Sequence, residues 1–265
     1  MAEVTEWDAH AYEAAASDVQ WAWGRKLLER RKWRGDERVL DAGCGPGGLT
    51  EHILAQVPRG HVHAVDHDAS MVNRARERLA KFGARVKVTQ ADLLHLEGVD
   101  AVDVVFSNAV LHWIRDHDAA FEAFVHHLKP GGQLLLQCGG EGNLERSRGA
   151  AREILSSPDF ERFFRGWEPP WRYEDDASTQ ERLFIAGFTD PEVTLEEAPT
   201  VFPDRASFEK FSRAVVLRPY LQVLPDEKAR DRFVERYVAR MEGGKAGFVL
   251  DYVRLNVSAF RSPHG

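Results

Sequence analysis

The sequence predicts an α/β fold with a mostly parallel sheet and helices on both faces, and two observations predict it. Between residues 36 and 138, short apolar segments of strand length alternate with segments of helical periodicity. This alternation is typical of parallel strands joined by crossover helices. In addition, the glycine-rich turn Asp41-Ala-Gly-Cys-Gly-Pro-Gly-Gly48 separates the first strand from the helix that follows it.

The elements of this region follow in order along the chain. The predicted strands span residues 38–42, 61–66, 85–90, 102–107 and 133–138. The predicted helices span residues 17–33, 49–57, 68–83 and 117–128. Pro58 stops the second helix, Asp68 caps the third, and Gly83 ends it. The sequence Lys129-Pro-Gly-Gly132 predicts a turn that leads into the fifth strand.

The pattern changes after residue 138. Residues 143–180 are rich in aromatic side chains and look helical but irregular, and a helix and a strand follow over 179–198. Two more helices, over 205–217 and 226–242, precede a last strand over 247–258. We expect a single domain built from a core and cap elements. The core takes in 36–138, 179–202 and 245–260, and the cap takes in 1–35, 143–175 and 203–242.

The composition of the chain excludes several classes of partner. The chain has 265 residues and a net charge of −7, which disfavours a nucleic-acid partner. It has no apolar run near the roughly 20 residues that span a bilayer and no signal-peptide core, so a cytoplasmic location is expected. Two cysteines give no disulfide framework, and the eleven histidines show no metal-ligand spacing. We expect a small-molecule substrate, no nucleic-acid, membrane or metal partner, and a monomer or homodimer.

The glycine turn alone leaves two cofactors open. Gly43, Gly45 and Gly48 fit the dinucleotide fingerprint G-x-G-x-x-G. Asp41, however, stands two residues before the first glycine, where a carboxylate favours a cationic ligand and repels a pyrophosphate. Asp66 ends the second strand, where a carboxylate can accept from ribose hydroxyls, although it could also be a turn residue.

These residues resemble the motifs of class I S-adenosylmethionine-dependent methyltransferases. The matching segments are Asp41-Ala-Gly-Cys-Gly-Pro-Gly47, Asp66, Ala91-Asp-Leu93, Ser107-Asn-Ala109 and Leu128-Lys-Pro-Gly-Gly132. The resemblance implies a Rossmann-like seven-stranded sheet whose last strand is antiparallel, and S-adenosylmethionine as cofactor. The cofactor residues that it implies are Asp41, Gly43, Cys44, Gly45, Gly47, Asp66, His67, Met71, Ala91, Asp92, Leu93, Asn108 and Ala109.

A narrower resemblance concerns the methyl acceptor. The stretch Asn108-Ala-Val-Leu-His-Trp113 is similar to that of trans-aconitate and juvenile hormone acid methyltransferases, which make methyl esters. It implies that Gln20 and Trp113 hold the carboxylate, and the catalytic residues that we expect are Gln20, His112 and Trp113. The expected substrate-binding residues are Tyr12, Gln20, Trp113, Phe164, Trp167 and Arg218.

The kind of acceptor stays open. The aromatic-rich insertion favours an apolar acid, unless those side chains only pack the cap. Arg213 and Arg218 are available for a polycarboxylic acid. A carboxylate is ionised at neutral pH and needs no general base. An amine, carbon or hydroxyl acceptor would instead use His112 as base. A non-catalytic S-adenosylmethionine-binding protein is the alternative of another class.

Overall fold

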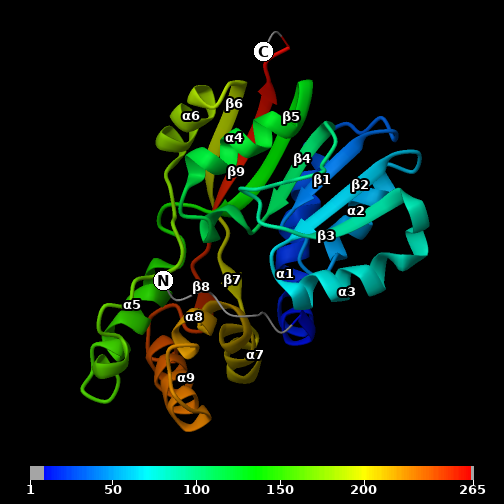
Figure 1. Ribbon diagram of the computed structural model, residues 1–265. Helices are drawn as coiled ribbons and strands as arrows, with labels where there is room; N and C mark the ends of the chain where they lie inside the picture. Colours follow the sequence, from blue (N-terminus) through cyan, green and yellow to red (C-terminus); the bar gives the residue numbers. More distant parts are fainter. Residues whose placement is uncertain (1–8, 264–265) are drawn as a thin grey trace.

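A computed structural model describes residues 9–263, apart from the side chains of residues 10–12 and 14–20. The strands of its main sheet are β1 Arg38–Ala42, β2 His61–Asp66, β3 Val86–Gln90, β4 Val102–Asn108, β5 Leu128–Gly139, β6 Phe188–Glu197 and β9 Val253–Arg261. They lie in the order β3-β2-β1-β4-β5-β9-β6, and β9 runs antiparallel to both of its neighbours (Figure 1). The seven-stranded, mostly parallel sheet is therefore confirmed.

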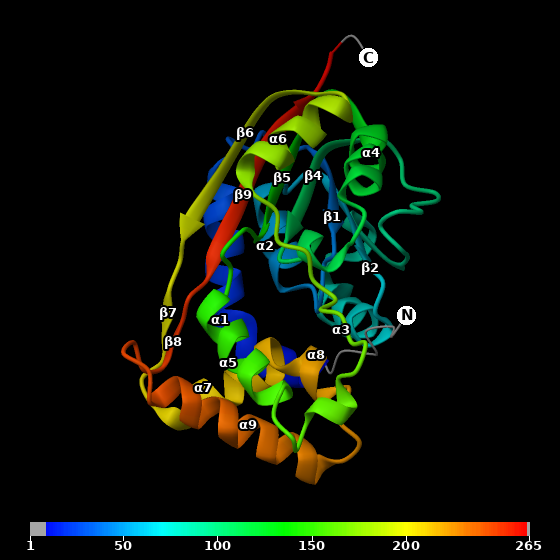
Figure 2. The ribbon, with the colours of Figure 1, turned by 90° about the vertical axis from the view of Figure 1, so that its left-hand side faces the viewer.

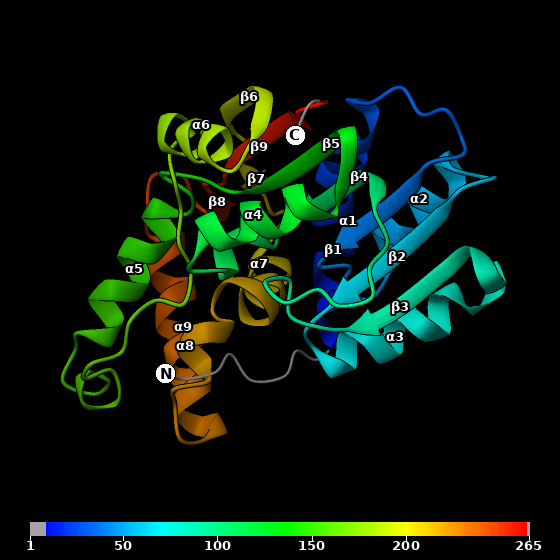
Figure 3. The ribbon, with the colours of Figure 1, turned by 45° about the horizontal axis from the view of Figure 1, so that its top comes forward.

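Helices cover both faces of this sheet (Figure 3). The helices of the sheet layers are α1 Ala9–Glu29, α2 Gly48–Gln56, α3 Ala69–Leu79, α4 His117–His127 and α6 Asp176–Ile185. Leu27 of α1, Ile53 of α2 and Leu79 of α3 share one buried cluster with the sheet. Phe121 of α4 and Leu183 of α6 belong to a cluster on the other face. Burial of these apolar side chains supplies most of the free energy that holds the layers together.

A helical cap lies beyond the carboxyl ends of the parallel strands (Figure 2). Its helices are α5 Glu145–Leu155, α7 Arg205–Phe211, α8 Arg218–Leu221 and α9 Glu227–Glu242, with short 3-10 or π turns at Glu161–Phe163 and Ser212–Val216. Phe160, Phe208, Phe233 and Tyr237 are fully buried in its core. The strands β7 Thr200–Val201 and β8 Val249–Leu250 form a small antiparallel ribbon within the cap. None of the described helices is long and apolar enough to cross a membrane.

The sheet and the early helices agree closely with the prediction, but the first helix differs. It begins at Ala9 and ends at Glu29, where residues 17–33 were expected. The Trp33 indole N–H donates to the Leu28 carbonyl at 3.0 Å, which satisfies an acceptor near the helix end outside the helical ladder. Leu27 and Leu28 pack under the sheet, so α1 is not only a cap element.

Three other boundaries differ for local reasons. The segment 129–132 is a bulge inside β5: Leu128 pairs with Val102, and Gln133 pairs with Val104. The predicted helix over 205–217 is broken by a π turn before α8. The last strand is also broken, because β8 ends at Leu250 and β9 begins only at Val253.

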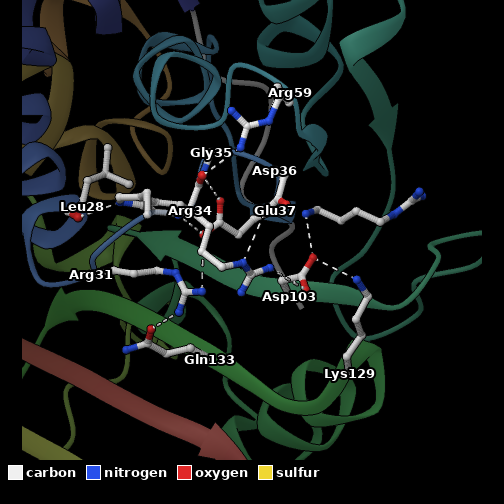
Figure 4. Close-up of polar contacts among 12 residues, drawn as sticks. Leu28, Arg31, Arg34, Gly35, Asp36, Glu37, Arg59, Asp103, Lys129 and Gln133 are labelled. Carbon is white, nitrogen blue, oxygen red and sulfur yellow. Dashed lines mark hydrogen bonds and ion pairs between the residues drawn. The ribbon is translucent and has the colours of Figure 1, made fainter.

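A polar network joins α1 to the amino-terminal end of the sheet (Figure 4). Glu37 is fully buried, and its carboxylate accepts the backbone N–H groups of Arg34 and Gly35 at 2.7 and 2.9 Å. Arg31 forms an ion pair with Glu37 at 3.6 Å and donates to Gln133 of β5 at 2.5 Å. This end of the sheet is opposite the cap and carries structural polar groups.

Candidate active site

The glycine turn after β1 is held against the end of β2. The Gly43 and Cys44 N–H groups both donate to the Val65 carbonyl, at 2.8 and 2.9 Å. The Gly45 N–H donates to one carboxylate oxygen of Asp66 at 2.8 Å, and the Asp68 N–H donates to the other at 3.0 Å. Each oxygen keeps lone-pair capacity for a ligand hydroxyl. Asp66 therefore both fixes the loop and faces the space beside it.

Backbone conformation shapes this corner. Gly43 has φ of 85°, and a Cβ placed on it would come within 2.1 Å of Val110. At the end of β4, Ala109 also lies in the left-handed region, with φ of 61°, and its N–H donates to the Gln137 carbonyl at 2.7 Å. A non-glycine residue in this region costs energy, and such residues are concentrated at functional sites. The two turns bring β1 and β4 together at the site.

Asp41 lies behind the glycine turn and not at its surface. The Thr50 hydroxyl of α2 donates to its carboxylate at 2.6 Å. Burial raises the pKa of Asp41 to about 7; the Thr50 hydrogen bond opposes this shift, and the nearby Asp66 charge adds to it. The negative charge of Asp41 can therefore favour a cationic ligand only through the loop.

A cavity of about 450 Å³ opens between this corner and the cap, a size usual for a small-molecule site. One half is lined by residues at the carboxyl ends of β1, β2 and β4 and by the loop after β3. Those of the expected cofactor residues that line it are Gly43, Gly45, Asp66, His67, Met71, Asp92, Leu93, Asn108 and Ala109. A Cβ on Gly45 would meet nothing within 4 Å, so the loop leaves room for a ligand there.

This half of the cavity suits S-adenosylmethionine. Asp66, buried at the end of β2, can accept from sugar hydroxyls, and Asp92 stands in the turn where an adenine amine would need an acceptor. The Leu94 N–H donates to one Asp92 oxygen at 2.9 Å, which fixes that side chain in its turn. Ala91, Cys44 and Gly47 do not line the cavity: Cys44 is buried in the layer beneath, and Gly47 packs against Ala75 and Leu79 of α3.

The other half of the cavity is built by the cap and by β9. The residues that line it are Asn143, Leu144, Ser147, Arg148, Trp171, Tyr173, Val215, Val216, Tyr220, Tyr252 and Arg254. The polar side chains of this half offer hydroxyl, amide and guanidinium donors, and no acidic side chain lines this half within the described part of the chain. Burial raises the pKa of Tyr173 to about 12, so its hydroxyl stays protonated at neutral pH.

His112 and Trp113 stand where the two halves meet. The Gly139 N–H donates to His112 Nδ1 at 3.2 Å, and the Arg172 N–H donates to the His112 carbonyl at 2.8 Å. Burial lowers the pKa of His112 well below its ordinary value, and the charges of Arg254 and His117 lower it further. The ring is therefore neutral, with its hydrogen on Nε2.

Three expected substrate residues lie elsewhere. Phe164 and Trp167 pack in the cap core, where Trp167 contacts Tyr220 with ring centroids 5.1 Å apart. Arg218 begins α8 and does not line the cavity. The periodicity of an aromatic segment does not reveal which side faces a cavity. The side chains of Tyr12 and Gln20 lie outside the described residues.

Several cavity residues were missed by the sequence reasoning, above all Arg254. One signal was present: β9 carries Arg254 and Asn256 between apolar neighbours, and both are buried. Buried polar side chains in an otherwise apolar strand are uncommon and call for an explanation. Arg213, a candidate for binding a polycarboxylic acid, pairs instead with Asp231 of α9 at 2.8 Å.

Comparison with known proteins agrees with this geometry. The family described as "Methyltransferase domain" matches residues 39–132. Trans-aconitate 2-methyltransferase of Methylobacterium nodulans is 30% identical over 250 residues, covering 90% of each chain. That of Azoarcus sp. is 30% identical and covers 90% of this chain and 88% of the relative. Phosphoethanolamine N-methyltransferase 2 of Haemonchus contortus, solved with S-adenosylhomocysteine, shares the fold. Its TM-score is 0.63 at 22% identity, over 96% of this chain and 57% of that one.

Proposed function

The chain belongs to the class I S-adenosylmethionine-dependent methyltransferases, in the family that includes bacterial trans-aconitate 2-methyltransferases, and we propose that it methylates a carboxylate of a small polar acid. The observation that carries the proposal is the acceptor half of the cavity. Its donors and guanidinium groups suit an anion, and an amine cation would meet no acidic side chain among the described residues that line this half. The names of the relatives support a polycarboxylic acid.

The same geometry disfavours an apolar acid. Of the six aromatic side chains in the insertion, only Trp171 and Tyr173 line the cavity. Phe160, Phe163 and Phe164 instead belong to the packing of the cap core. These three aromatic residues therefore stabilise the cap and do not form an apolar binding surface in the cavity.

His112 suits a carboxylate better than a base-dependent acceptor. A general base needs a lone pair facing the acceptor, but the Gly139 N–H occupies the Nδ1 lone pair and the ring hydrogen is on Nε2. An Nε2–H group can instead donate to a carboxylate oxygen. When bound, S-adenosylmethionine supplies an electrophilic methyl group on a cationic sulfur. The chain has to hold the acid in line with the methyl group and exclude water. Positioning of this kind can lower the activation free energy by roughly 7–11 kcal/mol.

A labelled-methyl assay tests the proposal. The protein is incubated with S-adenosylmethionine labelled in its methyl group and with panels of small acids, amines and phenols. We expect label in products of the acids only, and we expect mild alkali to release it as methanol because the product is an ester. Label that resists alkali, formed from amines or phenols, would refute carboxylate methylation.

Substitution of His112 separates a hydrogen-bond donor from a base. We expect H112Q, which keeps an N–H donor, to retain kcat/KM within about tenfold, and H112A to lose about 30-fold. Since burial keeps the pKa of His112 well below its ordinary value, H112Q should leave the shape of the rate profile between pH 6 and 8.5 unchanged. A step near pH 6.5 that disappears in H112Q, with a loss above about 1000-fold, would show that His112 is a base.

A further inference from the structure

Arg254 is the most deeply buried cation of the cavity wall. It is 3% exposed, and its guanidinium lies over the Trp23 ring of α1, 4.5 Å from the ring centroid. Arg148 and Arg115 also line the cavity, but their side chains are 22% and 60% exposed and pair with Glu145 and Glu168. Solvent weakens the interaction of an exposed cation with a ligand, whereas a buried guanidinium acts at low dielectric.

The sheet register places Arg254 beside His112. Arg254 on β9 lies directly opposite Gly139 on β5, and the Gly139 N–H is the group that binds His112 Nδ1. A Cβ on Gly139 would come within 2.6 Å of the Tyr173 ring and 2.7 Å of Asn143 Nδ2, so these two cavity residues pack directly on the Gly139 backbone. Burial lowers the pKa of His112 and raises the pKa values of Cys138 and Tyr173, and the charge of Arg254 acts to lower the pKa of all three groups. Its field therefore reaches this end of the cavity.

We propose that Arg254 binds a second, non-reacting carboxylate of the substrate and thereby selects polycarboxylic over monocarboxylic acids. This inference rests on the proposed function. A planar guanidinium binds a carboxylate through two parallel hydrogen bonds, which fixes both the position and the orientation of the acid. With one carboxylate on Arg254, the other lies toward His112 and Trp113, at the junction with the cofactor half. Arg254 is therefore the specificity-determining residue.

Three acids with a shared unsaturated skeleton test this role: crotonate with one carboxylate, fumarate with two and trans-aconitate with three. We expect the wild-type protein to prefer the last two. R254Q should lower kcat/KM for fumarate and trans-aconitate about 100-fold, mainly through KM, and for crotonate less than about threefold. R254K, which keeps a charge but not the planar fork, should lose about tenfold on the polycarboxylates only.

R240Q is the matched control, because Arg240 lies on the exposed side of α9 and pairs with Glu153, and it should leave all three rates unchanged. Equal losses on all three acids would overturn the proposal. If R254Q fails to fold, the same comparison in R254K decides. Calorimetry of trans-aconitate with S-adenosylhomocysteine present separates the two claims. If trans-aconitate binds with an affinity that depends on Arg254 but no ester forms, only carboxylate methylation is refuted. If R254Q and R254K bind trans-aconitate as tightly as the wild type does, only the role of Arg254 is refuted.

Discussion

Replacing Asp66 by alanine should lower the affinity for S-adenosylmethionine by about 1000-fold. The substitution removes the carboxylate that fixes the Gly45 and Asp68 N–H groups, and it removes the acceptor that we propose for the ribose hydroxyls. Charge-assisted hydrogen bonds of this kind are each worth about 1.5–3 kcal/mol. Calorimetry with S-adenosylmethionine and with its demethylated product measures the loss directly.

D100A is the matched control, because Asp100 is exposed and forms a surface ion pair with Arg38. We expect D100A to bind the cofactor as the wild type does, and thermal unfolding should show that D66A remains folded. Unchanged affinity in folded D66A would contradict the placement of the sugar at the end of β2. A loss in D66A that is confined to stability would reduce Asp66 to a turn residue.

The sequence predicted the cofactor half of the site, because short local motifs form that half. The turn 41–48, Asp66 and the segment 107–113 each follow a strand directly, so strand order alone brings them to one edge of the sheet. Hydrophobic periodicity placed β1 and β2 at their observed bounds, because these strands are largely buried and are followed by Gly43 and by the helix cap Asp68. Local sequence carries this kind of information well.

The acceptor half depends on contacts between distant parts of the chain. Arg254 reaches the cavity only because β9 inserts antiparallel between β5 and β6, beside residues more than 100 positions earlier. The cap aromatics show the converse. Phe164 and Trp167 have the composition of a binding surface, yet packing turns them toward Phe233 and Tyr220. Which face of a short irregular segment meets a cavity is decided by tertiary packing.

Removing the buried carboxylate of Glu37 should give the largest loss of stability. E37A leaves the Arg34 and Gly35 N–H groups and the Arg31 guanidinium without their acceptor at the junction of α1, β1 and β5 (Figure 4). Breaking a buried pair by removing one partner costs about 3–5 kcal/mol. In a chain of this size that corresponds to a drop of roughly 10 °C in the unfolding temperature. Thermal and urea unfolding measure both quantities.

The pH dependence of stability shows how much of the effect of Glu37 comes from its negative charge and how much from the packing of its side chain. Burial acts to raise the pKa of Glu37, but the backbone N–H donors and Arg31 outweigh it, so the pKa in the folded state is lowered. A lowered pKa stabilises the fold above the unfolded value near 4.3, and this contribution is lost as the pH falls through the folded value. E37Q should therefore be less stable than wild type at pH 7, and the difference should shrink below about pH 4.

Two outcomes would count against a structural role for Glu37. E153A is the matched control, because Glu153 is 59% exposed and forms a surface ion pair with Arg240, and it should change stability by less than about 0.5 kcal/mol. If E37A were no less stable than E153A, the polar network would contribute nothing to the fold. If E37A stayed folded but lost cofactor affinity, the amino-terminal end of the sheet would be coupled to the site at its carboxyl end, which the separate positions of the two clusters do not predict.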